Sequence, residues 1–229
     1  MLKVYGVPIS VHTRKVIMTA RFKRIPLEVV PVAPLLPDTV PPDWQHLSPT
    51  GKIPVLVDDD FLLGDSAAIC AYLERKQPAP ALYPEGDRDF AWTLSLEQYA
   101  GGTLFRDVVH PLFHQAIVNP RLKKIATDQA QVDIVVQRKI PEVYGYLDSI
   151  AGQGFFAGPR VSVADLAVVS NLVTVQYVGY PLDRARYPKL ANLVDRTIRL
   201  PEVKAALRDE QPAVRQMGLD GAFLDAVLA

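Results

Sequence analysis

Two short apolar runs joined by a polar turn stand out in the first third of the chain. The runs cover residues 53–57 and 61–63, and the three aspartates Asp58–Asp60 separate them. This pattern predicts a β-hairpin. Pro54 has no amide donor, so it must open the first strand. Cis peptide bonds are almost confined to proline, which makes Ile53–Pro54 a candidate, although trans is the commoner form.

A helix is predicted directly after the hairpin. Ile69 and Leu73 recur at helical spacing beyond Gly64, and either Asp65 or Ser66 occupies the N-cap position. A helix N-terminus presents free amides and the positive end of a dipole, which suit a ligand carboxylate. Simple capping of the helix explains the same residues equally well.

The residues before the hairpin predict a β-α-β unit. Apolar residues alternate at 2 and 4, recur at helical spacing at 16, 17 and 20, and form the run LEVV at 27–30. Together with the hairpin and the helix at 66, this order is the thioredoxin-like arrangement. The segment 31–42 holds five prolines, so it is predicted to be a loop that rims a pocket.

Ser10 is the candidate for chemistry, because it lies at or just before the N-terminus of the first helix. A hydroxyl there can donate a hydrogen bond to a bound thiolate and lower the pKa of the thiol. Ordinary capping is the competing explanation. His12 and Thr13 lie within one turn and could reach the same pocket edge. We expect His12 to be a solvated turn residue without a metal partner.

The remainder of the chain is predicted to be all-helical. We expect a first domain at 1–77, a Pro- and Gly-rich linker at 78–87 and a helical domain at 88–229, in which apolar residues recur only at helical spacing. Within the helical part, Ser162 and Asp165 have the spacing of a capping box.

Composition narrows the function classes. The 229 residues include 25 basic and 25 acidic side chains, and 49% are hydrophobic. With no basic surplus and no apolar run of membrane-spanning length, we expect neither a nucleic-acid nor a membrane partner, and a cytoplasmic location as the default. Cys70 is the only cysteine, which excludes an internal disulfide and a CxxC metal or redox motif.

Three segments resemble one known family. GKIPVL with the polar hairpin and the following DSxAI closely resembles the glutathione-binding half of cytosolic glutathione transferases. YGVPIS followed by Arg14, Lys15 and Val16 resembles the segment in which serine-type members, including bacterial ones, place their activating serine. The GxxxSxAD segment that ends at Asp165 resembles the capping motif of the family's helical domain. The resemblance implies an α/β thioredoxin-like N-terminal domain and an all-α C-terminal domain, the glutathione transferase fold.

The resemblance also implies roles for individual residues. Ser10 would activate the thiol of glutathione, the co-substrate, and the backbone of Ile53 beside a cis Pro54 would hold its cysteinyl part. Asp65 and Ser66 would hold its γ-glutamyl end. Many relatives bind the glycine carboxylate with a His or Lys where this chain has prolines, so Lys52 is the remaining cation for that role.

The implied activity is attack by the glutathione thiolate on a small hydrophobic electrophile or a peroxide, as in detoxification, without a metal. The alternatives are a glutathione-dependent isomerase and a non-catalytic interaction module. A homodimer is implied through the helix at 66–76 and the first long helix of the second domain. On that long helix Phe105, Val109, His110 and Phe113 can share a face, which would border the electrophile pocket or, as is commoner for an aromatic stripe, belong to the core.

Overall fold

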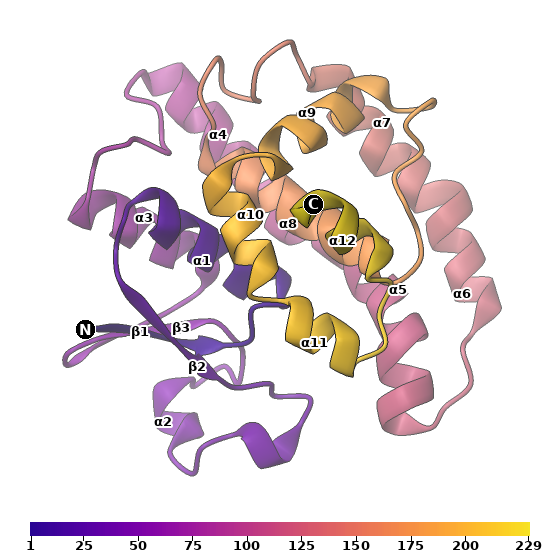
Figure 1. The fold of residues 1–229 in the computed structure, drawn as a ribbon, viewed down its shortest axis with the longest axis horizontal. Coiled ribbons are helices and arrows are strands. Elements are labelled where there is room, and N and C mark those ends of the chain that lie inside the picture. Colours follow the sequence, from indigo (N-terminus) through magenta and orange to yellow (C-terminus); the bar gives the residue numbers. More distant parts are fainter.

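The computed structural model describes residues 1–229 and places a small sheet beside a larger group of helices (Figure 1). The strands are β1 (Leu2–Gly6), β2 (Leu27–Pro31), β3 (Val55–Asp58) and β4 (Phe61–Gly64), in the order β2-β1-β3-β4. β1 and β2 are parallel, whereas β3 runs antiparallel to both β1 and β4. Parallel neighbours need a crossover, and α1 (Val11–Phe22) supplies it. The predicted thioredoxin-like arrangement is confirmed.

The rest of the N-terminal domain also follows the predicted order. α3 (Ser66–Lys76) begins directly after β4 and packs against α1. The proline-rich segment contains one 3₁₀ turn, Pro37–Thr39, and is followed by the short helix α2 (Trp44–Leu47).

The C-terminal domain is helical throughout, as predicted. One long continuous helix begins with α4 (Asp87–Tyr99) and continues through wider π-type turns at Ala100–Val109. It then includes the short α5 (His110–Phe113) and ends with further π-type turns at His114–Lys123. A second long helix consists of α6 (Gln129–Ile134), π-type turns at Val135–Lys139 and α7 (Ile140–Ile150). The remaining helices are α8 (Val163–Tyr177), α9 (Pro188–Ile198), α10 (Pro201–Arg208), α11 (Gln211–Gln216) and α12 (Ala222–Leu228). None of these helices combines the length and the apolar character needed to cross a membrane.

Helix α8 is the centre of the molecule. All of its residues except Gln176 are buried, as expected of a helix that is apolar on every side. It packs against α1 on the sheet side and against α4 and the 100–109 turns on the other. The Asp165 carboxylate accepts hydrogen bonds from the Ser162 amide at 2.8 Å and the Ser162 hydroxyl at 2.7 Å. The predicted Ser162–Asp165 pair therefore fixes the start of α8, with the serine hydroxyl as a donor to the carboxylate.

Arg14 ties α1 to the helical domain from a fully buried position. Its Nε and Nη2 atoms lie 2.5 Å and 2.8 Å from the two carboxylate oxygens of Glu210. Its Nη1 donates to the Ser170 carbonyl and the Thr174 hydroxyl, and the Tyr177 hydroxyl donates to Glu210 at 3.0 Å. The charge is thus paired and hydrogen-bonded, which is the condition under which proteins tolerate buried ions.

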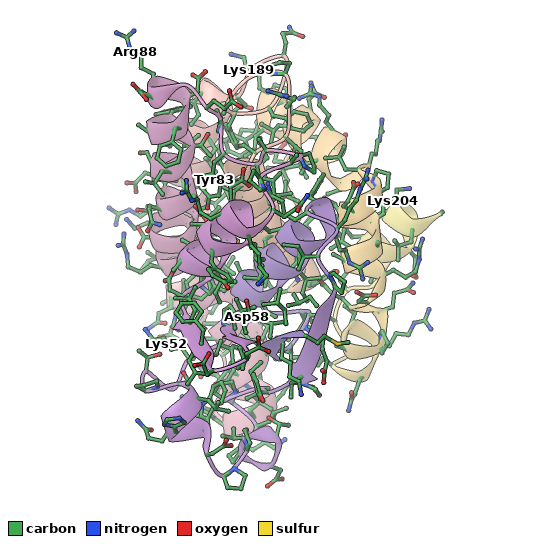
Figure 2. All side chains as sticks on the ribbon, turned by 90° about the vertical axis from the view of Figure 1, so that its left-hand side faces the viewer. Lys52, Asp58, Tyr83, Arg88, Lys189 and Lys204 are labelled. Carbon is green, nitrogen blue, oxygen red and sulfur yellow. The ribbon has the colours of Figure 1, made fainter.

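Two lysines of α1 are buried in the same way. Lys15 Nζ lies 2.6 Å from Glu97 of α4, which also accepts a hydrogen bond from the Tyr83 hydroxyl at 2.9 Å. Tyr83, labelled in Figure 2, lies in the segment that connects α3 to α4. Lys23 donates to the carbonyl of Pro80 in that segment and pairs with Glu74 of α3. Arg14 and Lys15 therefore link α1 to the helical domain through buried ion pairs, and Lys23, directly after α1, links its end to α3 and the connecting segment.

We predict that Arg14→Met lowers the free energy of unfolding by about 3 to 5 kcal/mol, because it leaves Glu210 buried without its cation. The matched control is Arg21→Met on the same helix. Arg21 pairs with Asp209 at the surface, where the two side chains are 38% and 44% exposed. Exposed pairs contribute about 1 kcal/mol or less. Urea unfolding followed by circular dichroism measures both variants, and equal losses would contradict the assignment.

Candidate active site

Ser10 lies in the turn between β1 and α1, at the N-cap of the helix. Its amide donates to the Val7 carbonyl at 3.0 Å, and its carbonyl accepts from the Arg14 amide at 2.7 Å. The side chain is half-buried and its hydroxyl makes no capping hydrogen bond. Ser10 therefore occupies the N-cap position without capping the helix through its side chain, unlike the ordinary capping serine considered from the sequence. The hydroxyl is free to bond a ligand.

The backbone on both sides of Ser10 is held by the helical domain. Arg14 Nη2 donates to the Ile9 carbonyl at 3.0 Å, and the Ser170 hydroxyl donates to the Val11 carbonyl at 2.5 Å. Both donors are buried. The buried network around Arg14 therefore fixes the position of the Ser10 turn.

Thr13 does not share the surface of Ser10. Its side chain is fully buried, and its hydroxyl has no hydrogen-bond partner. It packs so closely on β1 that a Cβ atom added to Gly6 would lie 2.4 Å from Thr13 Oγ1. The expectation that Thr13 could reach the pocket edge is wrong, because the helix turns this side chain towards the sheet.

His12 is not the solvated turn residue expected from the sequence. It lies in the first turn of α1, partly buried, with its Nδ1 atom 3.5 Å from the Ser66 hydroxyl. Its ring contacts that of Phe105 in the helical domain, with 4.6 Å between centroids and 59° between the ring planes. Burial, and then the charge of Lys15, lower the pKa of His12 from 6.5 to about 4. The imidazole is therefore neutral at pH 7.

The turn before β3 contains the predicted cis peptide. The Ile53–Pro54 bond is cis, and Pro54 directly precedes the first residue of the strand. The buried Ser48 hydroxyl donates to the Lys52 carbonyl at 2.8 Å and so braces this turn. The Lys52 side chain itself is exposed and extends from the surface (Figure 2). It has no carboxylate partner within the protein.

The sequence left open whether Asp65 or Ser66 caps the helix after the hairpin, and the structure shows that Asp65 is the cap. Asp65 is the N-cap of α3: its carboxylate accepts from the amides of Ala67 and Ala68 at 2.8 Å and 3.2 Å. Its φ of 68° lies in the left-handed region, which non-glycine residues rarely adopt outside special sites. Ser66 is 6% exposed and lies beside His12. Asp65 and Ser66, the two predicted glutathione contacts, therefore lie near the Ser10 turn, with His12 between Ser66 and that turn.

The four residues expected to share a face of the long helix in the second domain differ in their surroundings. Phe105 and Phe113 are half-buried and His110 is exposed, but Val109 is 1% exposed and belongs to the core. The π-type turns at 100–109 change the residue spacing, so a face drawn with α-helical spacing is misplaced. His114, which stacks on His110, was missed, although its spacing of four residues was a usable signal.

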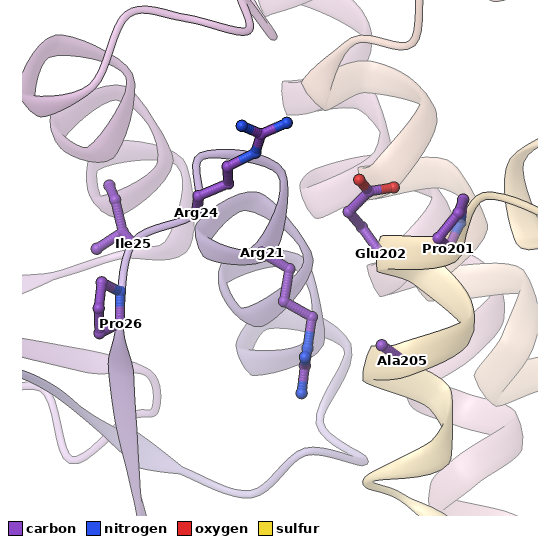
Figure 3. A pocket seen from close by; sticks show the side chains of 7 residues that line it. All are labelled: Arg21, Arg24, Ile25, Pro26, Pro201, Glu202 and Ala205. Carbon is purple, nitrogen blue, oxygen red and sulfur yellow. The ribbon is translucent and has the colours of Figure 1, made fainter.

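Two surface hollows lie away from these residues. One, of about 460 Å³, lies between the end of α1 and the start of α10 (Figure 3). Its walls include Arg24, Ile25 and Glu202. The other, of about 620 Å³, lies beside the 152–159 loop and Arg196. Neither contains a predicted site residue, so the candidate active site remains the group around Ser10.

The thioredoxin-like sheet beside an all-helical domain is the two-domain fold of glutathione S-transferases, and comparison with known proteins agrees. The family models "Glutathione S-transferase, N-terminal domain" and "Glutathione S-transferase, C-terminal domain" match residues 4–81 and 107–210. The chain therefore belongs to the glutathione S-transferase family.

Individual relatives cover nearly the whole chain. A zeta-class glutathione S-transferase of Euphorbia esula is 28% identical over 215 residues, 92% of each chain. A glutathione S-transferase of Triticum aestivum is 26% identical over 91% of this chain and 94% of its own length. The structure of a Sinorhizobium meliloti glutathione S-transferase superposes with a TM-score of 0.84 at 23% identity and covers 98% of each chain. The family and the fold implied by the sequence motifs are confirmed.

We predict that His12 makes the protein less stable as the pH falls. Between pH 6.5 and about 4 the unfolded chain binds a proton at this residue that the folded chain excludes, so stability rises with pH across this window. In urea unfolding, His12→Gln should lose less stability than the native chain between pH 7 and pH 5. An NMR titration of the His12 ring with a midpoint near 6.5 would contradict the prediction.

Proposed function

We propose that this protein is a glutathione transferase in which the Ser10 hydroxyl stabilises the glutathione thiolate for attack on an electrophilic carbon or a peroxide. The observation that carries the proposal is the free Ser10 hydroxyl at the N-terminus of α1. It lies within the segment that matches the family's N-terminal domain.

The proposed binding of glutathione follows from the neighbouring groups. The backbone of Ile53 beside Pro54 would pair with the cysteinyl part of glutathione, and Ser66, with Asp65 at the start of α3, would bind its γ-glutamyl end. The exposed ammonium of Lys52 would take the glycine carboxylate. His12, which lies beside Ser66, contacts Phe105 of the helical domain, so the electrophile would enter beside the helical domain.

The proposed chemistry depends on a pKa shift. An unperturbed thiol has a pKa of about 8.5, so little thiolate exists at neutral pH. A hydrogen bond to the charged form and a nearby helix N-terminus both favour the thiolate. The Ser10 hydroxyl can supply the first and the α1 N-terminus the second. Cys70 cannot replace glutathione as the nucleophile, because it is fully buried and its pKa is raised to about 12.

We predict that Ser10→Ala lowers conjugation at neutral pH about ten- to hundredfold and leaves the dissociation constant of glutathione nearly unchanged. Loss of a charge-assisted hydrogen bond of about 1.5 to 3 kcal/mol raises the thiol pKa by roughly one to two units. Stopped-flow and steady-state rates with a standard electrophile measure the effect.

The matched control is Thr13→Val, which removes a buried hydroxyl without a partner. This variant should conjugate at the native rate. A normal rate in Ser10→Ala together with a reduced rate in Thr13→Val would transfer the role to Thr13. Isomerase activity would consume no glutathione, and a non-catalytic module would turn over no electrophile in any variant.

We also propose two domains at 1–77 and 88–229, joined by the linker at 78–87, a cytoplasmic location and a homodimer. The dimer is supported by large apolar side chains that remain exposed along β4 and α4. Phe61, Phe90 and Leu94 are 45%, 44% and 40% exposed. Phe61 stacks on Tyr72 of α3 with 5.3 Å between centroids, so β4, α3 and α4 together offer apolar surface for a second copy.

We predict a sedimentation mass of two chains of 25.3 kDa each. Phe90→Asp should shift the protein towards the monomer, because a charge would then be buried at the contact. Phe155→Asp, at the loop beside Arg196, is the control and should leave the mass unchanged. A native mass of one chain would exclude the dimer.

A further inference from the structure

Three of the four histidines in the chain belong to one row of rings. His12 contacts Phe105 at 4.6 Å, Phe105 meets the edge of His110 at 5.8 Å, and His110 stacks on His114 at 4.2 Å, all between ring centroids. The row crosses from the N-terminal domain to the helical domain. We refer to these four side chains as the ring row.

The ring row begins at the proposed glutathione site. His12 lies two residues after Ser10 and within 3.5 Å of the Ser66 hydroxyl. From there the row becomes accessible: Phe105 and His114 are half-buried and His110 is exposed. An electrophile that meets a sulfur atom bound at Ser10 therefore has the ring row as its neighbouring surface on the helical domain.

The outer end of the ring row is suited to an anion. Neither His110 nor His114 donates a hydrogen bond to a carboxylate of the protein. Asp107, three residues before His110, is already paired with Arg106 at 2.6 Å. Burial, and then the neighbouring side chains of His110 and Lys123, lower the pKa of His114, and the Lys123 ammonium is a positive charge near this ring that favours an anion there. Neutral imidazole also carries one N–H donor that a carboxylate can accept.

We propose that the preferred electrophile is a planar aromatic compound that carries a carboxylate remote from its reacting carbon. Its aromatic part would lie on Phe105, and its carboxylate would accept hydrogen bonds from His110 and His114. Aromatic rings pair favourably at centroid distances of 4.5 to 7 Å, and the distances from Phe105 to its two neighbours in the ring row, 4.6 Å and 5.8 Å, fall within this range. This substrate class rests on the proposed function, because it requires glutathione bound beside Ser10.

The chemical step needs no further reactant. The thiolate sulfur forms a bond to the ring carbon that bears a halide, the electron pair is held in the ring, and the carbon–halogen bond then breaks. The halide leaves with its electron pair, and the thiol proton goes to solvent. The carboxylate takes no part in this step and contributes only to recognition.

A matched pair of probes tests the proposal: 4-chloro-3,5-dinitrobenzoate and 4-chloro-3,5-dinitrobenzamide. They share the ring, the leaving chloride and nearly the same size, and they differ in charge. Because the amide also withdraws more electron density from the ring than the carboxylate does, each kcat/KM compared below is divided by the rate constant of the uncatalysed reaction of the same probe with glutathione. The native chain should favour the acid in kcat/KM by about tenfold or more, as expected for a hydrogen bond to a charged group of about 1.5 to 3 kcal/mol. In His110→Phe combined with His114→Phe, which keeps both rings, this ratio should fall to about one.

His46→Gln is the control, because His46 is exposed on α2 and lies outside the ring row. It should keep the native ratio. Equal kcat/KM values for acid and amide in the native chain, or a native ratio in the double variant, would overturn the proposed substrate class while amide turnover still upholds the transferase. Turnover of neither probe by the native chain would overturn both proposals.

Discussion

The buried pair between Arg14 and Glu210 is the constraint on which the arrangement of the two domains depends. Both side chains are fully inaccessible, and removing two charges from water is costly unless nearly every donor and acceptor is satisfied. The carbonyl of Ser170 and the hydroxyls of Thr174 and Tyr177 satisfy them. The pair and its hydrogen bonds therefore join α1 to α8 and to the segment between α10 and α11, and removing either charge would leave the other one buried without a partner.

The network around Arg14 and Glu210 positions the proposed catalytic Ser10 through hydrogen bonds to the backbone beside it. Arg14 and Ser170 hold the carbonyls on either side of Ser10, so the turn is positioned by side chains that make no contact with a ligand. The hydroxyl of Ser10 itself remains uncommitted. The helical domain thus supplies the rigid support, and the N-terminal domain supplies the groups that we propose bind glutathione. Such support matters because a displacement of about 1 Å at a reacting group can cost a hundredfold in rate.

The sequence predicted best the features that are set locally. The β-hairpin around Asp58–Asp60, the start of α3 at Ser66 and the pairing of Ser162 with Asp165 follow from turn, capping and periodicity signals within a few residues. Family motifs then supplied the cis Pro54 and the overall fold.

Features that depend on distant partners were not predictable in this way. From the sequence, Arg14 was recognised only as part of a family motif. Its buried ion pair could not be predicted, because its partner Glu210 lies 196 positions later in the chain. His12 and Thr13 are neighbours on one helix, yet one contacts the helical domain and the other packs on β1. Helical spacing does not distinguish those surroundings. The prediction that Val109 shares a face with His110 was wrong for another reason, because π-type turns change the residue spacing.

The most direct test of the account is the ultraviolet absorbance of the thiolate of glutathione bound to the native chain, recorded against pH. If the turn held by Arg14 presents Ser10 to the sulfur, the titration midpoint of the bound thiol should lie at least one unit below the free value of about 8.5. Saturating binding of glutathione with an unshifted midpoint would contradict the account, because the site would then hold the ligand without activating it.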